Sequence, residues 1–145
     1  MPIFTVLPLL IIPIVIYNII AWGGATFSTA EAVRARMDAE FMSIPMASGA
    51  DWIITPGHGL VAFSLVMLFF ELLKSTGIGR AAVMNHAFSM VLFIICLVEF
   101  LMFQAFATSV FFLIMLMALM DVMAGFMVTI ASARRDIGIT ESFAD

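Results

Sequence analysis

The stretch LVEFLMFQAFATSVFFLIMLMALMDVMAGF, residues 97–126, decides the fold class of this chain. It contains two carboxylates, Glu99 and Asp121, and no basic residue, and most of its other residues are Phe, Met, Leu, Ile, Val or Ala. The short uncharged segment AFAT, residues 105–108, divides it into two apolar runs. A helix of about 20 residues crosses a bilayer, and each run extends to that length beyond the quoted stretch. The stretch therefore predicts an antiparallel hairpin of two transmembrane helices.

The composition of the whole chain agrees with a membrane protein. Its 145 residues, enough for one domain, are 64% hydrophobic and 11% charged, against roughly 45–50% and about 25% in soluble domains. A soluble fold of this size exposes too much of its surface to hide so many apolar side chains. The net charge of −4 and the six scattered basic residues disfavour nucleic-acid binding, which needs a clustered basic surface.

Four apolar segments are long enough to cross a membrane. They are predicted at about residues 3–22, 56–74, 80–105 and 109–133, with an outer loop at 23–54 and a short polar tail at 134–145. The first segment has no positively charged start, so we interpret it as a retained helix rather than a signal peptide. Pro8 and Pro13 predict a kink or a broken first turn in it. The expected fold is an all-α integral membrane protein, with four transmembrane helices in an antiparallel bundle.

The outer loop contains the only sizeable polar region. The sequence STAE at residues 28–31 is a capping box that predicts a helix start at Ser28. Val33, Met37 and Phe41 recur every four residues, so a short amphipathic helix is expected from Ser28 to about Phe41. It would lie on the membrane surface or on the bundle. Further along, Thr55 and the proline after it predict the start of the second transmembrane helix.

The basic residues predict the orientation in the membrane. If the N-terminus is cytoplasmic, Lys74, Arg80, Arg134 and Arg135 are cytoplasmic and only the two arginines at positions 34 and 36 lie outside. Because basic residues concentrate in cytoplasmic loops, we expect both termini inside. Both tryptophans then fall at the outer interface, where indole rings concentrate.

Small and polar residues recur at alternating spacings of three and four along three of the predicted helices. These seams are Gly57, Ser64, Glu71 and Ser75; Ala82, Asn85, Ser89, Leu92, Cys96, Glu99 and Phe103; and Ala118, Asp121, Gly125, Thr129 and Ser132. Small residues let helix backbones approach, and polar residues form hydrogen bonds across them. The seams predict a bundle with a polar stripe in its interior.

Depth in the membrane limits which of these polar groups can pair. Counted from the turn at about 1.5 Å per residue, Glu99 and Asp121 lie roughly 10 Å apart along the axis and do not form a catalytic dyad. Asp121 is level with Ser64 and slightly deeper than Ser89, so we expect it to hydrogen-bond to one of these hydroxyl groups. Both acids should face protein rather than lipid, because a carboxylate in lipid is costly. We expect both to be largely protonated.

The remaining polar groups fall at the two ends of the bundle. His58 and Asn18 lie near the outer interface, level with the acid nearer the turn. At the inner end, reflection of the second helix about its loop brings Glu71 near Asn85 and His86, and we expect Glu71 and His86 to interact. Either histidine could serve as a haem or pigment ligand, but they lie at opposite membrane levels and cannot share one haem iron.

Four sequence segments carry a resemblance to a known family. They are LFFELLKST at 68–76, LVEF at 97–100, ATSVFFLIMLMALMDVMAGF at 107–126 and ASARRDIG at 131–138. From Trp52 to Gly138 the chain resembles a family of small four-helix inner-membrane proteins of alphaproteobacteria. The resemblance implies a bacterial cytoplasmic membrane and carries no activity with it.

No nucleophile–base pair, phosphate-binding loop or zinc-ligand spacing is found, and the single cysteine, Cys96, lies in an apolar run. We therefore expect a non-enzymatic membrane protein that self-assembles or acts as an accessory subunit of a larger inner-membrane complex. The alternative is a homo-oligomeric ion or proton conductor that uses Glu99 and Asp121. A third possibility is a pigment- or haem-binding subunit, through His58 or His86. No metal or cofactor is predicted, and the expected partners are bound lipid, further copies of the chain and other membrane subunits.

Overall fold

The computed structural model describes residues 6–23, 29–75 and 80–142, and the side chains within them except those of 75, 80, 81, 129 and 131–142. Its helices are α1 (Ile11–Trp22), α2 (Ala30–Asp38), α3 (Pro56–Ser75), α4 (Arg80–Met102), the 3-10 helix η2 (Gln104–Phe106) and α5 (Ser109–Ser142). Three of them contain segments long and apolar enough to cross a membrane: Pro56–Lys74, Ala82–Met102 and Ser109–Val128. The prediction of a helical membrane protein is confirmed at this level.

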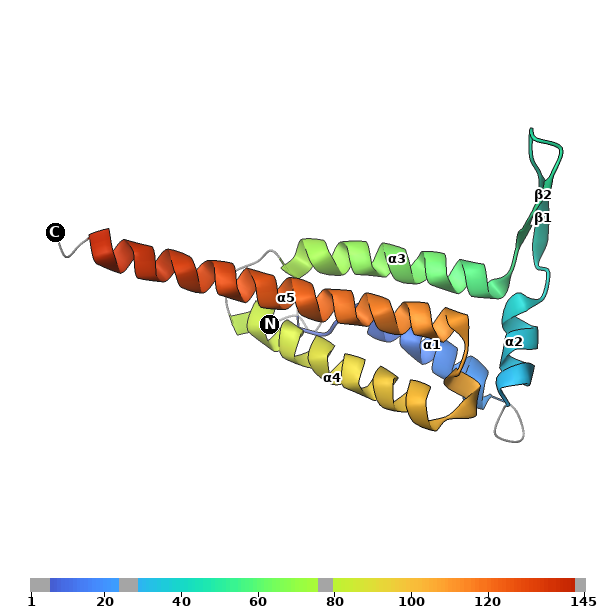
Figure 1. The fold of residues 1–145 in the computed structure, drawn as a ribbon, viewed down its shortest axis with the longest axis horizontal. Helices are drawn as coiled ribbons and strands as arrows, with labels where there is room; N and C mark the ends of the chain where they lie inside the picture. Colours follow the sequence, from blue (N-terminus) through green and yellow to red (C-terminus); the bar gives the residue numbers. More distant parts are fainter. Residues whose placement is uncertain (1–5, 24–28, 76–79, 143–145) are drawn as a thin grey trace.

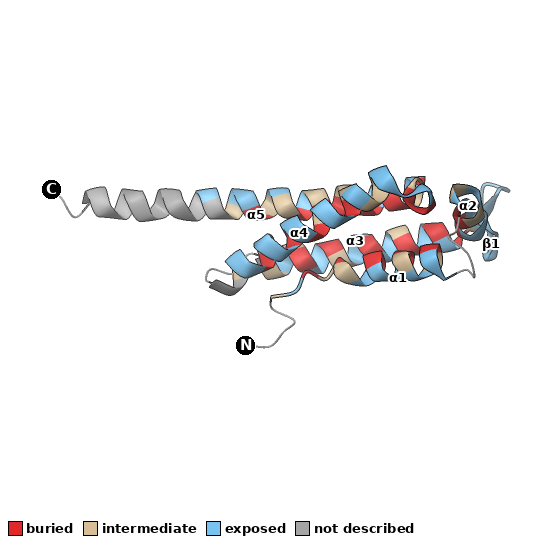
Figure 2. Cartoon of the chain, turned by 90° about the horizontal axis from the view of Figure 1, so that it is seen from below, coloured by how far each residue is buried: buried red, intermediate tan, exposed pale blue. Residues whose placement is uncertain are grey.

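The spanning helices lie alongside one another and share one axis direction (Figure 1). α5 lies between α3 and α4, and α4 and α5 diverge toward the end that carries α2 (Figure 1). The shorter α1 lies behind them at that end. Buried residues line the sides on which the helices meet, and most of the outer surface of α3 and α4 is exposed (Figure 2).

The helix of the first apolar segment is shorter than predicted. It covers 12 residues, Ile11–Trp22, and so rises about 18 Å, less than the ~30 Å thickness of a bilayer core. The broken first turn expected from the prolines is present: the backbone from Pro8 to Leu10 forms turns, and the Ile11 amide donates to the Pro8 carbonyl at 3.2 Å. Residues 1–5 lie outside the described residues.

The outer loop corrects two predictions about α2. The helix begins after Thr29, which is its N-cap and whose hydroxyl accepts a hydrogen bond from the Ala32 amide at 3.3 Å; the predicted cap, Ser28, lies outside the described residues. The helix ends at Asp38 rather than near Phe41, because the chain beyond it becomes extended. Its buried side chains, Val33 and Met37, pack on the bundle, which was one of the two expected positions.

A β-hairpin follows α2 and was not predicted. Strands β1 (Met42–Pro45) and β2 (Asp51–Ile54) pair antiparallel, with Met42 opposite Ile54 and Pro45 opposite Asp51. The connecting turn is closed by a hydrogen bond of 2.9 Å from the Gly49 amide to the Met46 carbonyl. Gly49 has a φ of 82°, in the left-handed region that a residue without a Cβ adopts most easily.

Helix α5 continues beyond the predicted end near residue 133. It contains 34 residues, or about 51 Å of rise, and projects beyond the other helices (Figure 1). The predicted polar tail is therefore largely helical, at least to Ser142. The reason is that no proline occurs after Pro56, so no residue removes a backbone donor from the helix.

Most members of the predicted seams are buried where the structure describes their side chains, but Ala82 and Glu99 are only half-buried and Phe103 is exposed. The fully or nearly fully buried members are Gly57, Ser64, Glu71, Asn85, Ser89, Leu92, Cys96, Ala118, Asp121 and Gly125. Gly57 sits where a Cβ atom would lie 3.0 Å from the Met37 carbonyl oxygen and 2.9 Å from Val110 Cγ2. Its missing side chain therefore allows α2 and α5 to approach the start of α3.

Candidate functional site: two buried polar clusters

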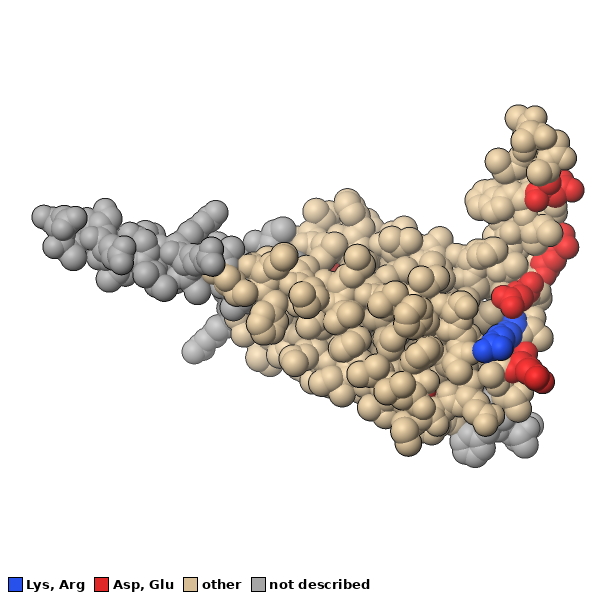
Figure 3. Space-filling view, in the orientation of Figure 1, with Lys and Arg blue, Asp and Glu red and all other residues tan. Residues whose placement is uncertain are grey.

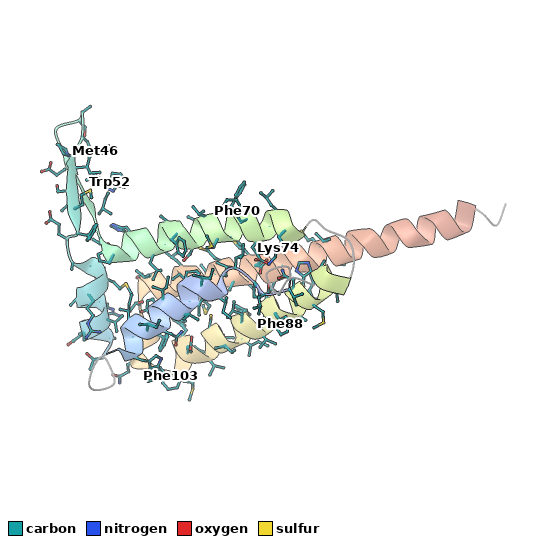
Figure 4. The ribbon with its side chains drawn as sticks, turned by 180° about the vertical axis from the view of Figure 1, so that it is seen from behind. Met46, Trp52, Phe70, Lys74, Phe88 and Phe103 are labelled. Carbon is teal, nitrogen blue, oxygen red and sulfur yellow. The ribbon has the colours of Figure 1, made fainter. Side chains whose placement is uncertain are left out.

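The first polar cluster forms around Glu71, near the C-terminal end of α3. Glu71 is fully buried, and its Oε2 accepts the Leu9 amide at 2.7 Å and lies 3.0 Å from Lys74 Nζ. Its Oε1 accepts a hydrogen bond from Asn85 Nδ2 on α4. Lys74 also donates to the Leu7 carbonyl at 2.7 Å. One carboxylate therefore joins α3, α4 and the segment before α1, beside Lys74, which is labelled in Figure 4.

This cluster compensates for the break in the first apolar segment. Backbone groups that leave a helix inside a membrane protein must find partners within the protein, because the bilayer core offers none. The turns around Pro8 leave the amide of Leu9 and the carbonyl of Leu7 without helical partners. Glu71 accepts from the first group and Lys74 donates to the second, so the cluster has a clear structural role.

The predicted pair of Glu71 and His86 is wrong by one residue. Asn85 occupies the position facing Glu71. The next residue lies about 100° further around the helix, at 3.6 residues per turn, and its imidazole packs against Gly125 of α5. A Cβ atom at Gly125 would overlap the ring of His86. Both ring nitrogens of His86 are buried and have no hydrogen-bond partner among the residues that the structure describes.

Asp121 lies one turn before Gly125 and faces the interior, as predicted, with 1% of its surface exposed. Of the two serines expected to hydrogen-bond to it, Ser89 lies within reach of the carboxylate, but each serine hydroxyl donates to a backbone carbonyl of its own helix. Ser64 Oγ donates to the Leu60 carbonyl at 2.7 Å, and Ser89 Oγ donates to the Asn85 carbonyl at 3.1 Å. Both serines thus bond to their own helices, as hydroxyl groups within helices commonly do. Within the described parts of the chain, neither oxygen of Asp121 has a hydrogen-bond partner.

The second polar cluster lies toward the other end of the bundle, around Glu99. Asn18 Nδ2 donates to Glu99 Oε2 at 3.3 Å and to the Ile14 carbonyl at 3.1 Å. Trp22 Nε1 donates to Asn18 Oδ1 at 3.1 Å. The prediction that Asn18 and Glu99 share a level is confirmed, and the contact joins α1 to α4.

His58 does not approach Glu99, although the two were predicted to lie at one level. Its amide donates to Thr55 Oγ1 at 3.2 Å, and its Nδ1 accepts from the Thr55 amide at 3.4 Å. This reciprocal pair caps α3 in the manner of a capping box and confirms Thr55 as the N-cap with Pro56 as the first helical residue. His58 and His86 lie at opposite ends of the bundle, as expected.

Two arginines of α2 bond to the end of the bundle on which α2 packs. Arg34 donates to the Ala107 carbonyl at 2.7 Å, and Arg36 donates to the Ile20 carbonyl at 3.0 Å. The carbonyls in the last turn of a helix have no partner within that helix, and Ile20 lies in the last turn of α1. The arginines thus bond to the backbone of the elements on which α2 packs.

Tyr17 is a buried polar residue that the sequence analysis did not identify. Its hydroxyl lies 2.5 Å from Thr108 Oγ1 and donates to the Ala105 carbonyl at 3.1 Å. Its ring packs against Phe106 and Phe111, with centroids 5.6 and 4.7 Å away. Tyr17 is the only tyrosine of the chain, and a lone phenol in an apolar helix was a signal of such a contact, because a buried tyrosine hydroxyl usually finds a partner.

An apolar layer separates the two polar clusters. Along α4, Leu92 and Cys96 lie between Ser89 and Glu99, and both are buried. Along α5, the buried residues before Asp121 on the same side are Phe111, Ile114 and Ala118. Among the described residues, no group of three or more His, Cys, Asp or Glu side chains is arranged to hold a metal ion. The clusters therefore join helices, and they do not form one polar path.

Comparison of the chain with known protein families, curated proteins and solved structures finds no match.

Proposed function

We propose that this chain is a non-enzymatic integral membrane protein that acts as a component of a membrane assembly. It assembles with copies of itself or serves as an accessory subunit of a larger complex. The observation that carries the proposal is a notch on the outer surface of the bundle, between α4 and α5. The notch has a volume of about 200 Å³ and is lined by His86, Ala87, Gly125 and four larger apolar side chains.

The notch has the features of a helix-packing site. Ala87 and Gly125 are small, and small residues allow a second helix to approach closely within a membrane. The volume is below the ~300–1,000 Å³ of typical ligand sites, but it accommodates a bulky apolar side chain from a neighbouring helix. His86, whose ring nitrogens have no hydrogen-bond partner in the described part of the chain, lies at its wall. A partner that fills the notch therefore also excludes lipid from around this polar ring.

The assembly proposal is tested by filling the notch. We expect wild-type protein in lipid nanodiscs to have a mass above that of one chain, whether from copies or from a co-purified subunit. Ala87→Phe should reduce it to one chain, because the added ring occupies the notch. Met84→Phe, an exposed position one turn away on α4 that does not line the notch, is the control and should leave the mass unchanged. A monomeric wild type, or equal effects of both variants, would contradict the proposal.

Ion or proton conduction is the second candidate, favoured by one observation: the carboxylate of Asp121 is buried without a hydrogen-bond partner among the described groups. The polar groups whose interactions reach it are Ser89, Glu71, His86 and Lys74. The apolar layer toward Glu99 speaks against a path through one chain. Proton uptake by the same reconstituted samples distinguishes the two functions. Conduction predicts uptake that Asp121→Asn abolishes, and assembly alone predicts none.

We further propose that the first apolar segment also crosses the membrane, so that four segments form an antiparallel bundle. Leu7 and Leu9 contact the C-terminal end of α3. Ile20 contacts α2, which lies beyond the N-terminal end of α3. Residues 7–20 thus reach between the two ends of a helix that is itself long enough to cross. The sequence resemblance supports a bacterial cytoplasmic membrane, and the positions of the basic residues support cytoplasmic termini.

The orientation is tested by labelling single cysteines in a Cys96→Ala background. We expect a membrane-impermeant maleimide applied outside intact cells to label Ser48→Cys in the hairpin turn and to leave Arg135→Cys unlabelled. Permeabilisation should then expose position 135. Labelling of position 135 in intact cells would mean that the C-terminus is outside, and the distribution of basic residues would have to be explained differently.

A further inference from the structure

The β-hairpin lies across the axis of the spanning helices. It leaves the N-terminal end of α3 and extends sideways beyond the bundle (Figure 1). If the helices cross a membrane, the hairpin therefore runs along the membrane surface, above the lipids that surround α3. Strands β1 and β2 are exposed along their length apart from the half-buried Ile54.

The two faces of the hairpin differ in chemistry. Side chains alternate between faces along a strand, and directly paired residues share a face. One face therefore carries Met42, Ile44, Trp52 and Ile54, whereas the other carries Ser43, Pro45, Asp51 and Ile53. Trp52 points toward the side on which α3 lies (Figure 4). The apolar face of the hairpin thus faces the membrane.

A cavity of about 480 Å³ opens beneath this face. Its lower wall consists of apolar side chains of α3 and α5, including Val61, Leu65 and Leu113, and its upper wall contains Trp52 and Asp38. The volume lies within the ~300–1,000 Å³ of typical ligand sites. An apolar wall at membrane depth and a polar wall at the surface match a molecule with one apolar and one polar end.

The polar wall offers two groups that attract a cation and one hydrogen-bond donor for an anion. The carboxylate of Asp38 and the indole face of Trp52 both attract an ammonium group, the second by cation–π interaction. His58 also lines the cavity, and its Nδ1 accepts the Thr55 amide, so the proton of the neutral ring lies on Nε2. That N–H is a donor for a phosphate or ester oxygen.

The charge of the surrounding surface favours the ammonium end. The charged side chains visible on this face of the molecule gather at the end formed by α2 and the hairpin, and most of them are carboxylates (Figure 3). Four acids lie in this region, Glu31, Asp38, Glu40 and Asp51, and its two arginines both donate to backbone carbonyls. A lipid with a purely anionic headgroup is disfavoured here.

We propose that the cavity beneath the hairpin binds one zwitterionic phospholipid of the adjoining leaflet. The ammonium group lies between Asp38 and Trp52, the phosphate accepts from His58 Nε2, and an acyl chain follows the groove between α3 and α5. The hairpin covers the headgroup, so the bound lipid exchanges more slowly than its neighbours in the bilayer. This site is distinct from the notch beside His86, and either can exist without the other.

The test uses the full chain purified in detergent, exposed to an equimolar mixture of dioleoyl phosphatidylethanolamine and dioleoyl phosphatidylglycerol. Native mass spectrometry then counts the lipids retained per chain. We expect one retained phosphatidylethanolamine and a clear excess over phosphatidylglycerol. Asp38→Asn and Trp52→Leu should each reduce retention about two- to fivefold, the range for an exposed ion pair or cation–π contact. Phosphoethanolamine, the headgroup without chains, should not compete, because it lacks the apolar part.

Asp51→Asn is the matched control, since Asp51 is an acid of the same hairpin that lies on its other face and does not line the cavity. It should retain the lipid as wild type does, and circular dichroism should show that all variants keep the helical fold. Equal retention of the two lipids, or equal losses for Asp38→Asn and Asp51→Asn, would overturn the proposal. A wild-type dimer without lipid that Trp52→Leu dissociates would also overturn it, in favour of a second copy in the cavity.

Discussion

Replacement of Glu71 by alanine should lower the free energy of unfolding more than any other single change to a polar residue of the chain. The carboxylate bonds to Leu9, Lys74 and Asn85 at once. Its removal leaves the backbone amide of Leu9 and the side chain of Asn85 without these partners. The expected loss is about 2–5 kcal/mol, from three contacts at ~0.6–1.7 kcal/mol each in a membrane protein. Unfolding by sodium dodecyl sulfate, monitored by far-ultraviolet circular dichroism, measures it.

Two further variants separate the contributions. Glu71→Gln keeps an acceptor for the Leu9 amide and loses the charge opposite Lys74. Its new NH2 group faces Asn85, whose amide can turn so that Oδ1, which has no partner among the described groups, accepts from it. The cost should therefore be about 1 kcal/mol or less for this partly exposed pair. Glu99→Ala removes the hydrogen bond that Glu99 accepts from Asn18 and should cost about 0.6–1.7 kcal/mol. If Glu71→Ala cost no more than Glu99→Ala, the structural role assigned to the first cluster would be wrong.

The second large effect is expected at Gly125. A Cβ atom at this position would overlap the imidazole of His86, and the ring is enclosed between α4 and α5. Gly125→Leu should therefore force the two helices apart and cost about 3 kcal/mol, toward the upper end of the range for overpacked cores. The same detergent-unfolding measurement applies.

Gly59 provides the control for this variant. A Cβ atom at Gly59 would have no neighbour within 4 Å, so Gly59→Ala should be neutral or stabilising by up to ~1 kcal/mol through helix propensity. The double variant His86→Ala with Gly125→Leu should cost less than the sum of the two single changes, because removal of the ring makes room for the leucine. Additive costs would show that the ring is not the obstacle.

The helices and their buried faces were predictable from the sequence because both depend on local spacing. The alternation of three and four residues identified Ser64, Asn85, Ser89 and Asp121 as interior groups, and the structure buries all four. The hairpin was not predictable in the same way. Its strands have four residues each, too few to establish an alternating pattern, and they follow directly after the helical period of Val33, Met37 and Phe41.

The pairings within the candidate site required three-dimensional information. Reflection of α3 about the loop that follows it placed Glu71 at the correct level of α4, but it did not decide whether Asn85 or His86 is the partner. One position along a helix corresponds to about 100° of rotation, which separates a bond to Glu71 from a contact with α5. The cluster's backbone partners, Leu7 and Leu9, were also beyond prediction, because any residue can supply a backbone group and its identity carries no signal.

The contact between Leu9 and Glu71 has a consequence for the order of events during synthesis. The two residues are 62 positions apart, so at ~5–20 residues per second the ribosome makes the acid about 3–12 s after the amide that it receives. Asn85 follows later still. If the first apolar segment crosses the membrane as proposed, it enters before its broken end has a partner, and an insertase or an aqueous vestibule must shelter those backbone groups until α3 is made.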